Sequence, residues 1–320
     1  MATVAGHGTI VTMGRETTYG TVFLTPTVKL PDMFEYSFGD SQVTVPQKTQ
    51  TLEGKVKTSQ SGRKSPTVTL SGVLTYAGHE ELLKAFFGQV TGTPYVFMIT
   101  DVAISTAGYS YTIACTVPTA TSNLGKGVVA LGCRLETLEI SRNGDYVGYT
   151  ATFRAKSIDD QATHSWVLSG LTDTDSTYPE LAPFLWQDVV VSLIDDGQAA
   201  ANTFSLTLTN TFADDDINFQ NKQTKQKDYK CSSGGVLTAE FLYDVTADAI
   251  VYDNILNQTC YADQIILYES GDATDYWTIA TEGQYIEYSK PDKENCIYVS
   301  SYTKQLMGDG DNKAISIEIT

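Results

Sequence analysis

Apolar and polar side chains alternate along several short stretches of the chain. The alternation is clearest in residues 67–75, 203–209 and 315–319, where threonine, serine or glutamate separates apolar side chains. Successive side chains of a strand point to opposite faces of a sheet, so this period of two predicts strands with one buried face. Further strands are expected at residues 95–99, 110–116, 135–141, 146–156 and 236–243.

Two stretches show the period of a helix instead. In residues 78–87 the leucine and phenylalanine side chains fall on one face, and Gly88 is placed to end a short amphipathic helix. Residues 246–256 show a similar pattern later in the chain. Each helix follows a predicted strand, so a strand and helix unit is expected in each half.

One tight hairpin is expected from local sequence. Asn143 and Gly144 lie between two predicted strands. These residue types adopt the positive φ angles that a two-residue hairpin turn requires. The turn is therefore expected within residues 142–145.

The second half of the chain echoes the first in the same order. Residues 73–76, at the junction of strand and helix, return as residues 240–243, and residues 111–114 return as residues 277–280. Several matches that stay collinear indicate a duplication. The 320 residues are then expected to form two domains of roughly 160 residues each.

The expected boundaries follow from composition. Residues 1–160 form the first domain, and its residues 1–33, rich in threonine and glycine without clear periodicity, are expected to be an extended arm. Residues 161–183 are polar and acidic and are expected to be a linker. Residues 184–320 form the second domain.

Charge and cysteine content narrow the function. The formal net charge is −17, and binding to a polyanion depends on lysine and arginine, so specific binding to DNA is not expected. The five cysteines are odd in number and include no Cys-x-x-Cys pair, which argues against a disulfide framework or a structural zinc site. No signal peptide and no apolar run long enough to span a bilayer is recognisable, so no membrane association is expected.

The residues that catalysis needs are scarce. His7, His79 and His164 have no nucleophile or metal ligand at a motif spacing, and each is expected to lie on the surface. Acidic clusters at residues 214–216 and 309–312 could hold a cation, but carboxylates exposed at turns are the preferred interpretation. We therefore expect no enzyme activity, no catalytic residue, no cofactor and no metal site.

Lysine and arginine gather in two segments that precede the strand and helix units. The positions are Lys48, Lys55, Lys57, Arg63 and Lys64 in the first half and Lys222, Lys225, Lys227 and Lys230 in the second. An isolated run of this kind would be a solvated loop. Its recurrence favours contacts with the acidic surface of another copy of the chain. Binding of DNA by these segments is a weaker alternative, because few aromatic residues lie among the cations.

Residues 14–21 (GRETTYGT), followed by the strand at 67–76 and the short helix at 80–88, resemble tail tube proteins of long-tailed bacteriophages. The resemblance covers roughly the first 160 residues in the order of elements, and the second half mainly through the echo. It implies a mainly β fold. Each of two tail-tube-like domains would be a β-sandwich or partial barrel with one short α-helix.

The resemblance also implies a function. Tail tube proteins form rings that stack into a tube, and in a duplicated two-domain variant three chains give pseudo-sixfold symmetry. The chain would be a structural virion protein of the tail, made in the host bacterial cytoplasm. Its partners would be copies of itself, the tail tip or initiator protein, the tail terminator and, in the lumen before ejection, the tape measure protein.

Two consequences of that function concern charge. DNA would pass without specific binding, because carboxylates lining a lumen repel phosphates over about 8 Å at physiological salt. The basic residues named above would make contacts between subunits or between rings.

Binding and hydrolytic functions are the alternatives. A tandem β-sandwich protein could recognise a carbohydrate or host surface, with Tyr268, Tyr276, Trp277 and Tyr285 stacking on sugars. In strands, however, such residues more often belong to a core or an interface. An acid hydrolase would need a pair of carboxylates, and the sequence singles out none.

Overall fold

Strands make up most of the described structure. The structure, a computed structural model, describes residues 10–23, 28–30, 33–48, 56–76, 78–88, 95–98, 110–119, 122–160, 183–192, 201–212, 217–218, 223–224, 230–269, 274–294, 297–307 and 314–320. The fold is mainly β, as the sequence predicts, and its strands pair in the antiparallel sense.

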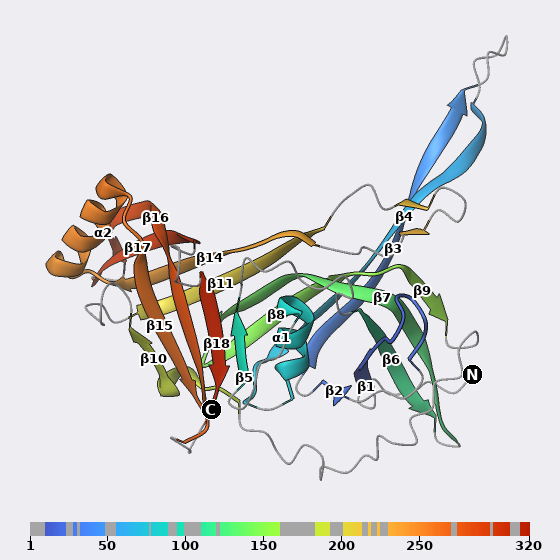
Figure 1. Cartoon of the computed structure of the whole chain (residues 1–320), viewed down its shortest axis with the longest axis horizontal. Coiled ribbons are helices and arrows are strands. Elements are labelled where there is room, and N and C mark those ends of the chain that lie inside the picture. The colour runs from blue at the N-terminus through green and yellow to red at the C-terminus, as the bar shows by residue number, and fades with distance from the viewer. Residues whose placement is uncertain are drawn as a thin grey trace.

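The elements are numbered in chain order (Figure 1). The first half holds β1 (Ile10–Arg15), β2 (Val28–Lys29), β3 (Met33–Lys48), β4 (Val56–Val73), α1 (Glu80–Phe87), β5 (Tyr95–Met98), β6 (Tyr111–Thr119), β7 (Ser122–Asn143), β8 (Tyr146–Arg154) and β9 (Ser157–Asp160). The second half holds the 3-10 helix η2 (Trp186–Asp188), β10 (Val189–Ser192), β11 (Ala201–Phe212), β12 (Ile217–Asn218), β13 (Gln223–Thr224), β14 (Lys230–Leu242), α2 (Val245–Asn257), β15 (Tyr261–Tyr268), β16 (Tyr276–Glu294), β17 (Ile297–Leu306) and β18 (Ile315–Ile319).

Helix α1 confirms the first helix prediction. Its leucine and phenylalanine side chains are buried, as expected for an amphipathic helix packed on a sheet. Gly88 ends the helix with a φ of 75°, and its N–H donates to the carbonyl of Lys84 at 2.9 Å. Glycine adopts this left-handed conformation without a steric penalty, which explains why the helix stops there.

Helix α2 begins at a side-chain cap. The carboxylate of Asp244 accepts hydrogen bonds from the N–H groups of Thr246 at 2.8 Å and Ala247 at 3.1 Å. These bonds satisfy two of the N–H groups that a helix leaves without an internal partner. The helix ends at Gln258, a non-glycine residue with a φ of 54°. Its observed range is close to the predicted 246–256.

The predicted hairpin forms, but its turn is displaced by one residue. Asn143 is still in β7 and pairs with Tyr146 of β8, so Gly144 and Asp145 are the two turn residues. Gly144 has a φ of 66°, whereas Asn143 and Asp145 are not among the residues with positive φ. A positive φ at the first turn position alone corresponds to a type II′ turn and needs only one glycine.

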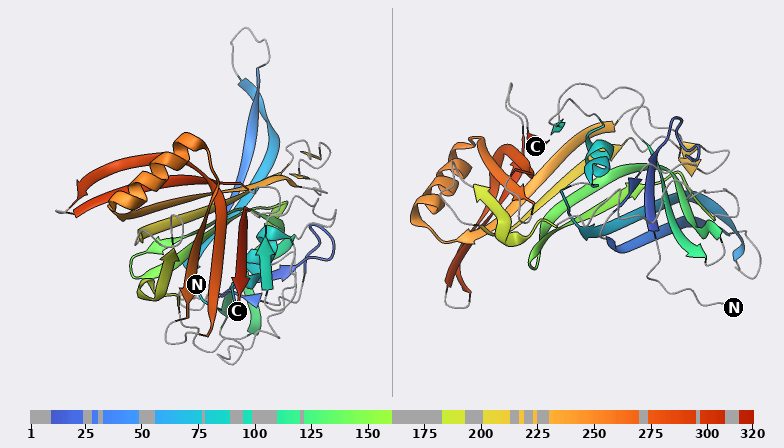
Figure 2. Two further views of the ribbon diagram at one scale, coloured as in Figure 1. Left: turned by 60° about the vertical axis from the view of Figure 1, so that its left-hand side comes forward. Right: turned by 90° about the horizontal axis from the view of Figure 1, so that it is seen from below.

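Most strands belong to one large sheet that includes both halves. Its main path runs β10-β15-β16-β17-β14-β11-β7-β6-β1-β2, with β8 pairing β7 and β4, and β3 pairing β4. The hairpin of β3 and β4 projects from the body, and α2 lies near the opposite end (Figures 1 and 2). The two ends of the molecule therefore carry different elements.

Pairing follows the same order in each half. In the first half β1 pairs β6, and the path continues through β7, β8, β4 and β3. In the second half β10 pairs β15, and the path continues through β16, β17, β14 and β11. Strand β9 lies on β7 as β18 lies on β16, and α1 follows β4 as α2 follows β14.

Only the first of the two sequence matches joins strands that hold the same place in this order of pairing. Residues 73–76 and 240–243 lie at the ends of β4 and β14, which occupy the same place in the pattern. Residues 111–114 lie in β6, whose place in the second half is taken by β15, whereas residues 277–280 lie in β16. The second match therefore joins strands with different neighbours.

Part of the expected arm is packed in the sheet. Residues 10–15 form β1, which pairs β6 from Ile10 opposite Thr116 to Arg15 opposite Tyr111. Val11 and Met13 are buried in the main core. Their alternation is too short to stand out among the surrounding threonine and glycine, which is why the sequence predicted an extended segment here.

Candidate assembly surfaces

The first basic segment lies on the projecting hairpin. Lys48 is the last residue of β3, and Lys57, Arg63 and Lys64 are in β4, with Lys64 opposite Gln42 in the ladder. Lys55 lies outside the described residues. The segment expected to be a loop is thus largely a pair of long strands that extends away from the body (Figure 2).

One residue of the second basic segment lies within the described part of the chain. Lys230 begins β14, opposite Phe212 of β11, while Lys222, Lys225 and Lys227 lie outside the described residues. Strand β13, which falls between Lys222 and Lys225 in the sequence, contacts β4. Residues 223–224, between Lys222 and Lys225 in the sequence, therefore lie next to the strand that carries part of the first basic segment.

The two halves meet along a backbone ladder. Strand β11 pairs β7 from Ser205 opposite Ser141 to Thr209 opposite Thr137. The hydroxyl of Ser205 donates to Glu139 at 3.1 Å. A continuous ladder leaves no open strand edge between the halves at this point.

A buried amide strengthens this contact. The Nδ2 atom of Asn210 in β11 donates to the carbonyl of Phe86 in α1 at 3.0 Å and to the carbonyl of Leu135 in β7 at 3.1 Å. The first acceptor lies near the end of a helix, where carbonyls lack partners within the helix. One side chain of the second half thus satisfies two backbone groups of the first.

A second contact joins the halves near β18. Strand β18 pairs β5, with Ile317 opposite Phe97. The indole N–H of Trp277 donates to the carbonyl of Tyr76 at 2.9 Å, and the hydroxyl of Tyr76 donates to the carbonyl of Thr320 at 2.7 Å. These contacts lie apart from the ladder of β7 and β11, and backbone hydrogen bonds between Val147 and Phe184 and between Trp186 and Asp145 link the halves further.

The central sheet has one apolar face and one polar face. The apolar side chains of β4, β7, β8, β11, β14 and β17 point into the core, on the side that carries both helices. Side chains on the opposite face are mostly hydroxyls and carboxylates. They include Ser37, Thr67, Thr69, Ser71, Glu139, Thr150, Thr152, Ser205, Thr207, Thr209, Thr238, Glu240, Glu287, Ser301 and Thr303. Arg154, at the margin, is ion-paired with Glu136 at 2.6 Å.

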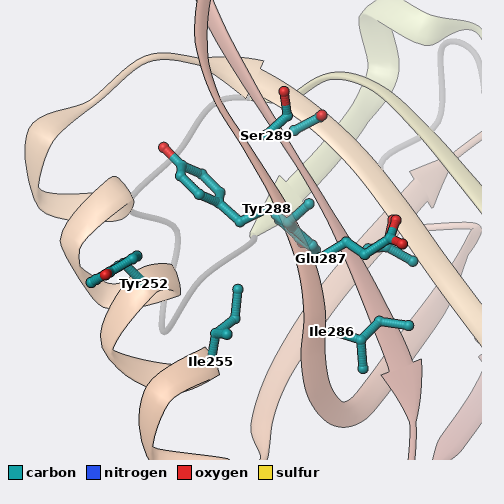
Figure 3. A pocket seen from close by; sticks show the side chains of 9 residues that line it. Tyr252, Ile255, Ile286, Glu287, Tyr288 and Ser289 are labelled. Atoms are coloured by element: carbon teal, nitrogen blue, oxygen red, sulfur yellow. The ribbon is translucent and has the colours of Figure 1, made fainter.

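An open groove lies between α2 and the paired strands β16 and β17 (Figure 3). Its volume is about 640 Å³. Tyr288 extends from β16 towards α2, from which Tyr252 and Ile255 project. The lining residues are Tyr252, Ile255, Ile286, Glu287, Tyr288, Ser289, Ser301, Tyr302 and Thr303. The groove brings tyrosine and isoleucine side chains together with a glutamate, two serines and a threonine beside the edge of β16.

A comparison with known families bears on the role of these surfaces. Residues 6–314 match the family described as phage tail tube protein. The chain belongs to the phage tail tube protein family. A search of curated proteins found no match. This tail tube protein is therefore a structural component of a phage tail that assembles with other tail proteins, and its family membership confirms the resemblance seen in the sequence.

The tail tube protein has a buried carboxylate that the sequence did not identify. Each oxygen of Glu16 accepts two hydrogen bonds: Oε2 from the N–H of Gly20 and the hydroxyl of Ser110, both at 2.7 Å, and Oε1 from the hydroxyl of Thr112 at 3.0 Å and the N–H of Gly132 at 2.8 Å. Glu16 lies in the GRETTYGT motif on which the resemblance rests. One of these bonds closes residues 16–20 on themselves, and the other three tie this segment to Ser110, β6 and β7.

A buried ion pair lies inside the second half. Lys304 donates to Asp263 at 2.9 Å, and both side chains are fully buried. The hydroxyls of Tyr302 and Tyr285 also donate to Asp263, at 3.2 and 3.4 Å. Burial lowers the pKa of Lys304, and the negative charge of Asp263 opposes this effect. Lys304 alternates with the buried residues Tyr302 and Leu306, and this register is the one sequence signal of its burial.

The prediction that His79 lies on the surface is wrong. His79 is fully buried, and its ring lies 4.7 Å from that of Tyr149. The N–H of Thr75 donates to its Nδ1 atom at 3.2 Å, and the Thr75 hydroxyl lies 2.9 Å from the same atom. Burial lowers the pKa of His79 from 6.5 to about 3, although the bond from Thr75 opposes the shift. His7 and His164 lie outside the described residues.

The aromatic residues considered for sugar binding are differently placed. Trp277 and Tyr285 are buried, so neither offers an open ring face to a sugar. Tyr268 and Tyr276 are half-buried and contact each other, with ring centroids 5.5 Å apart. The structure thus uses these residues in packing.

The described residues offer few candidates for a metal site or a reactive thiol. No group of three or more histidine, cysteine, aspartate or glutamate side chains is suitably placed there for a metal ion. The clusters at 214–216 and 309–312 lie outside these ranges. Cys115, Cys133 and Cys260 are free thiols, and burial raises the pKa of Cys133 well above its usual value. Among the described helices, none is long and apolar enough to cross a membrane.

Proposed function

We propose that this tail tube protein forms rings in which its two halves occupy successive, similar positions, so that three chains give a pseudo-sixfold ring. The single observation that carries the proposal is the shared order of pairing, from β1 to β3 in the first half and from β10 to β11 in the second. Under this proposal residues 1–160 and 184–320 are the two tube domains, joined by a linker at 161–183.

The rings stack into a tube, and the polar face of the sheet lines its lumen. This face is contributed by the same four places of the pattern in each half, and its carboxylates include Glu139, Glu240 and Glu287. Hydroxyl and carboxylate groups neither attract nor bind phosphate strongly, and the net charge of −17 adds a repulsive field. DNA would therefore pass without being held.

The partners follow from this role. They are copies of the chain, the tail tip or initiator protein, the tail terminator, and the tape measure protein that fills the lumen before ejection. The basic segments, the first of which lies largely on the projecting hairpin, are proposed to contact the acidic surface of a neighbouring subunit or ring.

Electron microscopy of assembled tubes tests the stoichiometry. Purified protein, alone or with the tail tip initiator, is expected to form tubes whose reconstruction shows three chains per ring, with the polar sheet face inward. Six chains per ring would overturn the trimer. A strictly monomeric species that forms neither rings nor tubes would overturn assembly itself.

A further inference from the structure

The groove beside α2 in the second half corresponds to a place beside α1 that strand β11 fills in the first half. Ile140 of β7 pairs Tyr149, which pairs Gly72 of β4. In the second half Tyr288 of β16 pairs Tyr302, which pairs Ala239 of β14. Strands β4 and β14 hold the same place before a helix, so Tyr288 takes the place of Ile140.

The edge of β7 at this place is covered, whereas that of β16 is open. Ile140 pairs Leu206 of β11. A strand of the second half therefore covers this edge of β7. Within the described part of the chain, residues 286–289 of β16 have a neighbouring strand on one edge only, and that strand is β17. The groove lies along the opposite edge of this stretch, next to α2.

The strand equivalent to β11 is β3. Leu206 pairs Leu237 of β14, and Tyr36 pairs Leu70 of β4, which holds the same place as Leu237. Leu206 is fully buried against the first half, whereas Tyr36 is 41% exposed. In the described ranges, β4 is the strand that pairs β3. Strand β3 therefore has an edge at which another strand can pair, as β7 pairs with β11.

The helices differ in the same way. When α1 and α2 are aligned at their left-handed caps, Gly88 and Gln258, Leu82 corresponds to Tyr252 and Phe86 to Leu256. Both α1 residues are 1% exposed, whereas Tyr252 is 53% and Leu256 63% exposed. The second helix thus shows apolar surface at positions that the first helix buries.

We propose that the groove between α2 and β16 binds strand β3 of a second copy of the chain, as β7 and α1 bind β11 within one chain. The internal ladder fixes the register: Tyr36 lies opposite Tyr288, Ser37 opposite Glu287 and Phe38 opposite Ile286. Because the donor strand and the groove are different surfaces, the contact is head-to-tail and closes into a ring when the rotation permits. The inference rests on the proposed ring, and adds its interface.

A pair of cysteines tests the register in the full-length protein. Ser37 and Glu287 are exposed, so S37C with E287C leaves the core intact. Directly opposed residues of neighbouring strands have the spacing that a disulfide needs. After assembly and mild oxidation, at least half of the chains are expected to migrate as disulfide-linked dimers and trimers on non-reducing gels.

Two control pairs set the scale. T207C with E139C places cysteines at the equivalent positions within one chain and is expected to form an intramolecular disulfide without a change of mass. S37C with T238C places the second cysteine on β14, separated from β16 by β17. This pair is expected to give at least tenfold less linked product than S37C with E287C.

The outcomes separate the interface from the function. Tubes in which S37C and E287C do not link, while the internal pair does, would overturn the interface and leave the tube function standing. Absence of rings and tubes from the unsubstituted protein would overturn both. Linkage equal to that of the T238C control would also reject the register.

Discussion

Asn210 and Phe86 lie 124 positions apart in the sequence, yet the side-chain amide of one donates to the carbonyl of the other at 3.0 Å. The contact is buried, and the same Nδ2 atom also donates to Leu135. Most of the sheet could be divided between two units with local pairing. This amide instead makes the end of a helix in one half depend on a strand of the other.

We predict that Asn210→Leu weakens the whole fold. Leucine has a similar size but no donor, so two buried carbonyls lose a partner, at about 1–3 kcal/mol of unfolding free energy. Urea denaturation of the unassembled protein measures the loss. Thr209→Ala, at the exposed neighbouring position, is the control and is expected to change stability by less than about 0.5 kcal/mol. Equal effects of the two substitutions would contradict the role of the amide.

Lys304 and Asp263 give a second prediction. Lys304→Met leaves the buried carboxylate without its cation, and breaking a buried pair in this way costs about 3–5 kcal/mol. Adding Asp263→Leu removes the stranded charge, so the double variant is expected to be more stable than Lys304→Met alone. A double-mutant cycle measured by urea denaturation checks this. Strictly additive losses would show that the two groups do not interact.

The buried histidine predicts a dependence of stability on pH. The pKa of His79 is about 3 in the folded protein and 6.5 without burial, so the unfolded chain takes up a proton first. The stabilising effect of the neutral ring is complete above pH 6.5 and is lost as the pH falls towards 3. Between pH 6 and 5 the slope approaches about 1.4 kcal/mol per pH unit.

His79→Gln isolates this effect. The variant lacks the titrating ring but keeps His7 and His164, so the difference in slope belongs to His79. Urea midpoints at pH 7, 6 and 5 are expected to fall more steeply for the original protein than for the variant. Parallel curves would show that His79 does not titrate with a lowered pKa.

The basic segments predict an effect on assembly without one on folding. Replacement of Lys222, Lys225, Lys227 and Lys230 by glutamate is expected to prevent tube formation, because the segment would then repel the acidic surface of a neighbour. The circular dichroism spectrum and the melting temperature of the monomer are expected to stay unchanged. Replacement of the same four residues by arginine keeps the charge and should allow tubes. Tubes of normal length from the glutamate variant would show that these residues are only solvated.

Local signals predicted local structure well. The apolar stripe of α1 and the glycine after it define that helix within a few residues, and Gly144 marks the hairpin even though the turn begins one residue later than expected. Alternation also identified β11 and β18. Each of these features depends on neighbours in the sequence.

Long-range contacts escaped the same reasoning. The pairing of β11 with β7 depends on two strands far apart in the sequence, and no residue of either strand specifies the other. Gly132 has a φ of 64° and lies within the long strand β7. The partner of this strand changes along its length from β6 to β8. Lys304 and His79 were not recognised as buried because polarity alone predicts exposure, whereas Asp263 and Thr75 supply partners that only the fold brings close.

The pairing of β18 with β5 affects the timing of folding. Strand β5 finds its partner only after residues 315–319 have left the ribosome, and contacts of such high sequence separation form slowly. The first half can build most of its sheet during synthesis, but it must wait for the second half before this edge is closed. The edge of the first half at β5 is therefore completed only by a strand that the second half supplies.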